Sequence, residues 1–149
     1  MEFDRTKTLV QLKREKFREP AWDFLPFSSG YYLRNTPVRE LRAVDLWVLI
    51  RQGIGLDYLV LLALERLEVE PLLKCRHTEG DLLSAVLWAD ALVWKRNPHY
   101  RERVTKIWRK VSARLMANEH PMARMLFRDY RWFLKSDKFL PQDSINVQA

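Results

Sequence analysis

Hydrophobic residues recur along most of the chain at spacings of three and four positions, which is the period of an amphipathic α-helix. Leu46, Trp47, Leu49 and Ile50 follow this spacing, and the stretch 82–93 follows it with one residue out of step. No stretch alternates between apolar and polar residues for long enough to predict a β-strand. The pattern therefore predicts an all-α protein, a single-domain bundle of about six helices.

Glycine, proline and capping residues mark where the predicted helices begin and end. Gly53 and Gly55 supply the positive φ angles needed for a sharp turn, and Thr78 with Asp81 fits a reciprocal capping box. The predicted helices cover about residues 8–16, 43–52, 56–68 and 78–95, two more begin near residues 98 and 121, and residues 20–30 form an irregular segment.

The predicted helix at about 56–68 differs from the others because it is apolar on every side. Its run from Tyr58 to Leu64 contains no polar side chain other than the tyrosine hydroxyl. A helix of this kind must be surrounded by other elements, so we expect it at the centre of the bundle.

The length and the lone cysteine bound the class of protein. A chain of 149 residues without repeats or a linker predicts one domain over 1–149, with a frayed tail at 141–149. Cys75 cannot form an intrachain disulfide, and charged residues at 2–5 argue against a signal peptide. The longest apolar run is too short to cross a bilayer. We therefore expect a cytoplasmic protein that does not interact with membranes.

The net charge of +7 is concentrated at the C-terminal end. Residues 1–53 carry ten basic and seven acidic groups, residues 54–95 carry four and seven, and residues 96–149 carry twelve and five. A basic region of this kind suits a binder of phosphate backbones and equally a protein that docks on an acidic partner. Both alternatives stay open on charge alone.

Candidate catalytic and metal-binding patterns are sparse. None of His77, His99 and His120 has the spacing of a zinc site, and Cys75 to Asp81 is more simply a loop before a helix. Gly53-Ile54-Gly55 lacks the third glycine and the preceding strand of a dinucleotide fingerprint. The sequence therefore predicts no enzyme, no cofactor and no metal site.

Tryptophan and arginine supply the strongest binding signal. Trp47, Trp88 and Trp108 lie on apolar helix faces and are expected in the core, and burial is also favoured for Trp132. Trp132 lies among basic residues, however, so a role in stacking or at a protein interface stays open. The same predicted helix carries a basic stripe at helical spacing: Arg124, Arg128, Arg131 and Lys135.

Several short motifs lie between residues 31 and 88. They are Tyr31-Tyr32-Leu33-Arg34, Pro37-Val38, Asp45-Leu46, Gln52 to Val60, Ala63-Leu64, Pro71-Leu72 and Gly80-Asp81-Leu82-Leu83. In content and separation, they resemble one group of bacterial contact-dependent growth inhibition immunity proteins. The chain departs from that pattern at Leu61, where a proline is expected.

The resemblance implies a function by stoichiometric binding. Such a protein neutralises the toxic C-terminal domain, often a nuclease, of a cell-surface effector delivered by neighbouring sister cells. It acts in the cytoplasm, protects the producing cell and its siblings, and requires neither catalysis nor a cofactor. The alternative is a small basic helical nucleic-acid-binding protein, although the helix after Gly55 is too apolar to enter a groove.

The partner-binding residues are expected outside the motif, which ends near Leu87, because specificity for one toxin needs residues that do not build the scaffold. The expected site is two basic helix faces meeting an acidic toxin surface: Arg124, Arg128, Arg131 and Lys135 on one, and Arg103, Lys106, Lys110 and Arg114 on the other. The competing site is acidic and would mimic phosphate: Glu65, Glu68 and Glu70. A monomer is expected.

Overall fold

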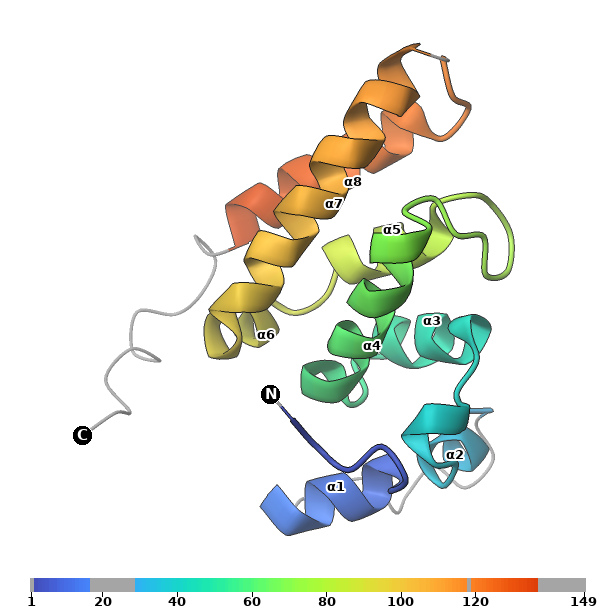
Figure 1. The fold of residues 1–149 in the computed structure, drawn as a ribbon, viewed down its shortest axis with the longest axis vertical. Helices are drawn as coiled ribbons and strands as arrows, with labels where there is room; N and C mark the ends of the chain where they lie inside the picture. The colour runs from blue at the N-terminus through green and yellow to red at the C-terminus, as the bar shows by residue number, and fades with distance from the viewer. Residues whose placement is uncertain (1, 17–28, 118, 137–149) are drawn as a thin grey trace, which may run out of the picture.

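The computed structural model describes residues 2–16, 29–117 and 119–136, and within them it contains eight α-helices and no strand (Figure 1). The helices are α1 (Leu9–Lys16), α2 (Ser29–Arg34), α3 (Ala43–Arg51), α4 (Leu56–Val69), α5 (Asp81–Leu87), α6 (Ala91–Arg96), α7 (Pro98–Ala117) and α8 (Ala123–Lys135), with the short 3-10 helix η2 (Val38–Glu40) between α2 and α3. The predicted all-α class is confirmed.

Helix α4 is the centre of the fold. It packs against α3, α5, α6 and α7, and nine of its residues are buried, in keeping with its apolar sequence. Leu59, Val60, Ala63, Leu64 and Leu67 are completely inaccessible to solvent. The prediction of a central helix at about 56–68 is therefore confirmed.

A tight turn joins α3 to α4. Gly53 has φ +72° and Gly55 has φ +63°, which confirms the positive φ angles predicted for this turn. A Cβ atom added to Gly55 would lie 2.8 Å from Cδ2 of Leu9 in α1, whereas one at Gly53 would meet nothing within 4 Å. Gly55 therefore serves the backbone conformation and also the close approach of α1 to the turn.

The structure corrects three details of the predicted elements. The helix expected over 78–95 is broken into α5 and α6, because Asp90 caps a new helix by accepting a hydrogen bond from the backbone N–H of Leu92 (2.8 Å). Residues 29–34, at the edge of the predicted irregular segment, form α2, which packs on α3. The rest of that segment and the predicted tail at 141–149 lie outside the described residues.

The third correction concerns the predicted capping box of Thr78 and Asp81. Helix α5 begins after Gly80 (φ +82°), and no side chain caps its first turn. The carboxylate of Asp81 accepts hydrogen bonds from the backbone N–H groups of Cys75, Arg76 and His77 at 2.8–2.9 Å, and one half of the predicted box remains as a long hydrogen bond from the Thr78 N–H at 3.5 Å. Asp81 therefore organises the loop before α5, and its own helix starts from a left-handed glycine.

Helices α7 and α8 run side by side along one edge of the molecule (Figure 1). Trp108 of α7 is buried, as predicted, and stacks on Tyr130 of α8 with ring centroids 4.3 Å apart. Helix α8 also packs against α5, so its inner side covers two helices and its outer side faces away from both. No helix among the described residues combines the length and the apolar character needed to cross a membrane.

Candidate functional site

The basic stripe of α8 lies on the outer side of that helix. Arg124, Arg128, Arg131 and Lys135 are all exposed, while Leu126, Asp129 and Phe133 of the same helix are buried. Arg128 forms an ion pair with the neighbouring Asp129 at 3.1 Å. The other three cations form no ion pair with any residue that the structure describes. Most of the positive charge of this stripe is therefore not neutralised by the residues that the structure describes.

Asp129 is a buried carboxylate that joins α8 to α5, and sequence analysis did not single it out. It is completely buried and accepts hydrogen bonds from the Ser84 hydroxyl and from the Trp88 indole N–H, both at 2.7 Å. The signal in the sequence was its position: it is the single acidic residue of α8 and falls on the apolar side, between Leu126 and Phe133. A carboxylate in that position needs partners of its own.

The basic stripe of α7 lies on a different side of the helix pair. Lys106, Lys110 and Arg114 are exposed, but Arg103 bonds to Glu68 of α4. Arg101, on another side of α7, reaches α8 by donating a hydrogen bond to the carbonyl of Phe133 at 3.1 Å. Arg103 therefore lies toward α4, whereas the contact from α7 to α8 is made by Arg101, which is not part of the predicted stripe.

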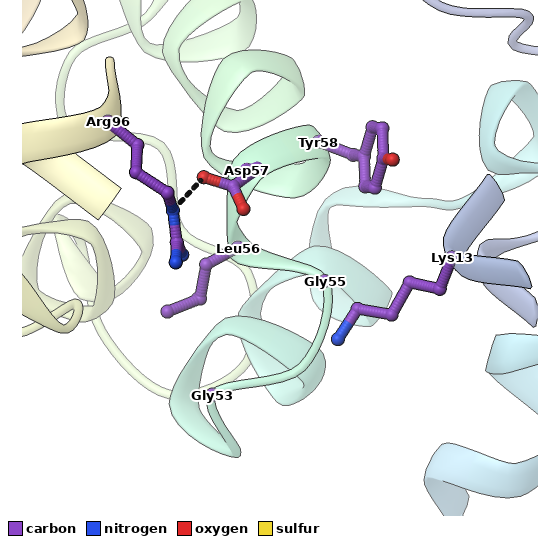
Figure 2. A pocket seen from close by; sticks show the side chains of 7 residues that line it. All are labelled: Lys13, Gly53, Gly55, Leu56, Asp57, Tyr58 and Arg96. Atoms are coloured by element: carbon purple, nitrogen blue, oxygen red, sulfur yellow. Dashed lines mark hydrogen bonds and ion pairs between the residues drawn. The ribbon is translucent and has the colours of Figure 1, made fainter. Parts of the chain in front are cut away.

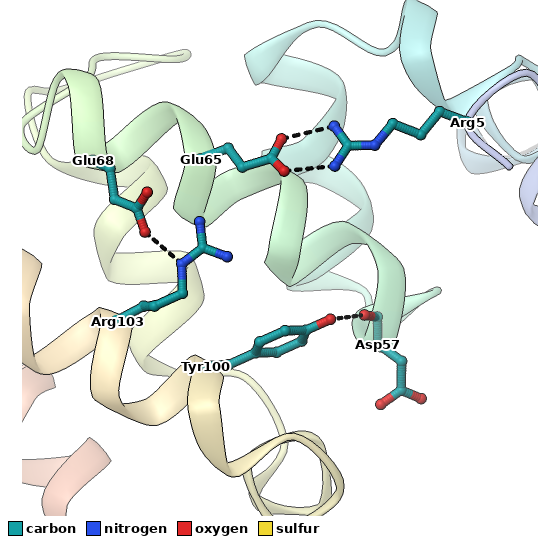
Figure 3. A network of polar contacts seen from close by, with 6 residues as sticks. All are labelled: Arg5, Asp57, Glu65, Glu68, Tyr100 and Arg103. Carbon is teal, nitrogen blue, oxygen red and sulfur yellow. Dashed lines mark hydrogen bonds and ion pairs between the residues drawn. The ribbon is translucent and has the colours of Figure 1, made fainter. Parts of the chain in front are cut away.

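The competing acidic residues on α4 are mostly engaged inside the chain (Figure 3). Glu65 accepts two hydrogen bonds from Arg5, at 2.6 and 2.8 Å, and these bonds lower the pKa of its carboxyl. Glu68 is held by Arg103, while Glu70 is exposed at the end of α4. Glu65 and Glu68 therefore bond neighbouring segments to α4, whereas Glu70 faces solvent.

Trp88 and Trp132 contradict the prediction that they are buried. Trp88 is 47% exposed and Trp132 is 38% exposed, and their rings stack with centroids 4.9 Å apart and an interplanar angle of 22°. The reason is the break after α5: Trp88 follows the last residue of that helix as its C-cap, and its indole N–H reaches Asp129 of α8. Trp47, also expected in the core, is only partly buried.

A shallow depression of about 410 Å³ lies next to this tryptophan pair. Its lining includes Arg51 from α3, Ser84 from α5, Trp88 directly after α5, and Met125 and Arg128 from α8. We call this lining, together with Trp132, the aromatic depression. It combines exposed aromatic surface with two arginines, a composition found at the energetic centres of protein interfaces.

A second, smaller pocket lies at the turn between α3 and α4. It measures about 130 Å³ and is lined by Lys13, Gly53, Gly55, Leu56, Asp57, Tyr58 and Arg96. Figure 2 shows Lys13 and Arg96 on opposite sides of the turn, with Arg96 bonded to Asp57 at 3.1 Å. Pockets that hold cofactors are usually about 300–1,000 Å³, so this one is too small for a dinucleotide.

The cysteine and the histidines outside the two pockets, which could in principle act as nucleophiles, bases or metal ligands, make structural contacts. Burial raises the pKa of the Cys75 thiol to about 12, which leaves little of the reactive thiolate at neutral pH. His120 lies 2.6 Å from Glu79, and the rings of His77 and Trp47 pack in a T-shaped arrangement with centroids 5.8 Å apart. Among the described residues, no three His, Cys, Asp or Glu side chains are grouped so that they could hold a metal ion.

Comparison with known proteins gives one match. The family model of CDI immunity proteins, in which CDI denotes contact-dependent growth inhibition, matches residues 11–104, well over half of the chain. No curated protein and no solved structure matches. The match covers α4 and the helices packed around it and ends within α7, before α8. The chain therefore belongs to the CDI immunity proteins, a family that provides immunity against CDI toxins.

Proposed function

We propose that this protein binds the C-terminal toxin domain of its cognate CDI effector, a nuclease, and neutralises it by stoichiometric binding. It acts in the cytoplasm, protects the producing cell and its siblings, and performs no catalysis of its own. Family membership supports binding to a toxin. A basic inhibitor suits a nuclease that carries an acidic surface beside its active site.

The observation that carries this proposal is the outer side of α8. Arg124, Arg131 and Lys135 are exposed there and form no ion pair with a described residue. Because like charges held close together on one helix destabilise it slightly, an unneutralised stripe is a cost that binding to an acidic partner would remove. The stripe also lies beyond the part of the chain that the family model matches.

The acidic edge of α4 is the weaker candidate. Glu65 and Glu68 are each bonded to an arginine of the same chain, so either would have to leave its partner before it could mimic phosphate. Glu70 alone among the three is exposed without an ion pair to a described residue. Substitution of Glu70 therefore tests the competing acidic site without breaking an ion pair between described residues.

The test is co-expression with the C-terminal domain of a cognate CDI effector, sought as a large secreted protein encoded directly upstream of this gene. Unmodified protein should restore growth and bind the purified domain. Arg124→Glu with Arg131→Glu should slow association and cost about 2–5 kcal/mol of binding if those contacts are buried in the complex. Arg128 is left unchanged because its charge lies against buried Asp129.

Glu70→Lys is the matched control. It should protect as well as the unmodified protein, and failure of this variant together with full protection by the double reversal would move the site to the acidic edge. Strong, salt-sensitive binding of DNA or RNA by the isolated protein in a gel-shift assay at two salt concentrations would favour the nucleic-acid alternative instead.

A further inference from the structure

We propose that the aromatic depression is the anchor point for the toxin, and that its occupant is a toxin segment bearing an apolar side chain flanked by Asp or Glu. This inference rests on the proposed function, and it names the surface and the partner chemistry that would carry most of the binding free energy. Its centre is the stacked pair Trp88 and Trp132.

The tryptophan pair presents exposed aromatic surface. The two adjacent indoles are 47% and 38% exposed, and they lie beside the shallow depression of about 410 Å³. Tryptophan and arginine are the residue types most enriched where truncation costs the most binding energy. An apolar side chain entering the depression would bury this surface.

Hydrogen bonds to Asp129 hold the wall of the depression in place. The Trp88 indole N–H donates to completely buried Asp129, and Asp129 also accepts from Ser84 below it. Arg128 is held by the same carboxylate at 3.1 Å. Binding therefore immobilises little that is not already ordered, which lowers the entropic cost of association. Packing alone does not require a carboxylate at the buried position of Asp129, and a role in ordering the depression accounts for it.

The charged residues of the lining are basic. They are Arg51 and Arg128, and because Arg128 is paired with Asp129, Arg51 supplies the positive charge that no described acid neutralises. Arg51 lies 5.1 Å from the Trp47 ring centroid, and Arg76 lies over the same ring at 5.4 Å, so basic character continues beyond the depression. The complementary partner is a carboxylate beside an apolar side chain. The carboxylate would neutralise the positive charge at the edge of the depression, while the apolar side chain would fill its centre.

The experiment measures binding of the purified cognate toxin domain by calorimetry. Trp132→Ala removes an exposed ring from the stack, and Arg51→Glu reverses an exposed charge. Each should weaken binding by about 10-fold or more. Trp88 is not the first choice, because its removal would leave Asp129 without a donor.

Two matched controls lie on α7, away from the depression. Met116→Ala removes an exposed apolar side chain, and Arg109→Glu changes the net charge as Arg51→Glu does. Both should stay within about 2-fold of the unmodified protein. Thermal unfolding of all four variants separates loss of binding from loss of folding.

The partner chemistry has its own readout. Replacing acidic surface residues of the toxin domain by Lys, one at a time, should yield at least one variant that binds Arg51→Glu protein better than it binds the unmodified protein. If folded Trp132→Ala and Arg51→Glu proteins bind as tightly as the controls, the depression is not the anchor, although the proposed function stands.

Two other outcomes reject the inference for different reasons. If the unmodified protein neither binds the toxin domain nor restores growth, the proposed function fails and the anchor site fails with it. If a single-stranded RNA oligomer binds the isolated protein and Trp132→Ala abolishes that binding, the tryptophan pair stacks on bases and the protein segment is the wrong occupant.

Discussion

The polar residues around α4 and those on the outer side of α8 differ in where their partners lie. Around α4, Glu65 bonds to Arg5, Glu68 bonds to Arg103, and the Tyr100 hydroxyl donates to the carbonyl of Asp57 at 2.9 Å (Figure 3). On α8, most of the basic stripe forms no ion pair with described residues, and two tryptophans remain exposed. Charges that pair internally join helices, whereas charges left over are available to a partner.

This contrast follows the boundary of the family match. Residues 11–104 include α4 and the helices that surround it, while α8 lies beyond them. The matched part supplies most of the buried core and the α4 side of the internal ion pairs, so changes to its buried or internally paired residues should act mainly on folding. Changes on the outer side of α8 should act mainly on toxin binding.

Leu62→Asp should have the largest effect on folding. Leu62 is buried in α4, and an unpaired carboxylate there costs several kcal/mol out of a total stability of roughly 5–15 kcal/mol. We expect loss of the cooperative thermal transition measured by circular dichroism. Leu134→Asp, on an exposed position of α8, should keep it. A normal transition for Leu62→Asp would mean that α4 is not the core helix.

Gly55→Val should cost about 2–4 kcal/mol. The valine must adopt φ +63°, and its Cβ would lie 2.8 Å from Leu9, so backbone strain and overpacking both contribute. Gly53→Val is the matched control, because it has the same strain at φ +72° but open space around the Cβ. Urea unfolding of both variants measures the difference. Equal losses would show that the contact with α1 contributes nothing.

The central helix and the turn before it were predictable because their causes are local. A helix that is apolar on every side must be surrounded, and Gly55 can adopt a conformation that other residues avoid. The break between α5 and α6 was missed because the apolar spacing continues through it. Its local cues were Trp88, one step out of phase, and Asp90, an N-cap residue followed by a helix.

Asp129→Ala should cost about 1–3 kcal/mol, because it leaves the Trp88 indole N–H and the Ser84 hydroxyl without their acceptor. It should also weaken toxin binding by loosening the tryptophan pair, which makes Asp129 the residue where the two regions meet. Asp129→Asn retains an acceptor and should lose less of both. Urea unfolding measures the loss of stability, and calorimetry measures the loss of toxin binding. If the Asp129→Ala protein binds the toxin as tightly as the unmodified protein, the aromatic depression is not part of the toxin-binding site.

The exposed tryptophans were not predictable from spacing. Helical periodicity assigns Trp132 to a side of α8, but exposure depends on which helices cover that side, and this is set by contacts between segments far apart in the chain. Trp88 lies opposite Trp132 only because α5 ends there and α8 crosses it. The basic stripe was predictable, since four cations at helical spacing share one side wherever the helix packs.

Acid should destabilise the region around α4 by a smaller, graded amount. The hydrogen bonds from Arg5 lower the pKa of Glu65. Burial alone would raise the pKa of Asp81, but the hydrogen bonds that its carboxylate accepts from backbone N–H groups lower this pKa overall. Because both folded pKa values lie below the ordinary ones, stability should be constant above about pH 5 and fall below about pH 4. Urea midpoints against pH measure this, and a weaker slope for Asp81→Asn would identify its share.

Arg131→Glu should have the smallest effect on stability, and that effect should be favourable. The new carboxylate lies one turn before Lys135 and one turn after Arg128, so it replaces repulsion by attraction and adds about 0.2–0.5 kcal/mol. The same change places a negative charge on the side of α8 that is proposed to meet an acidic toxin surface. We therefore expect an unchanged or slightly higher melting temperature together with slower association, most clearly at low salt. A melting temperature that falls, or an association rate that does not change, would mean that this side of α8 serves the fold and not the partner.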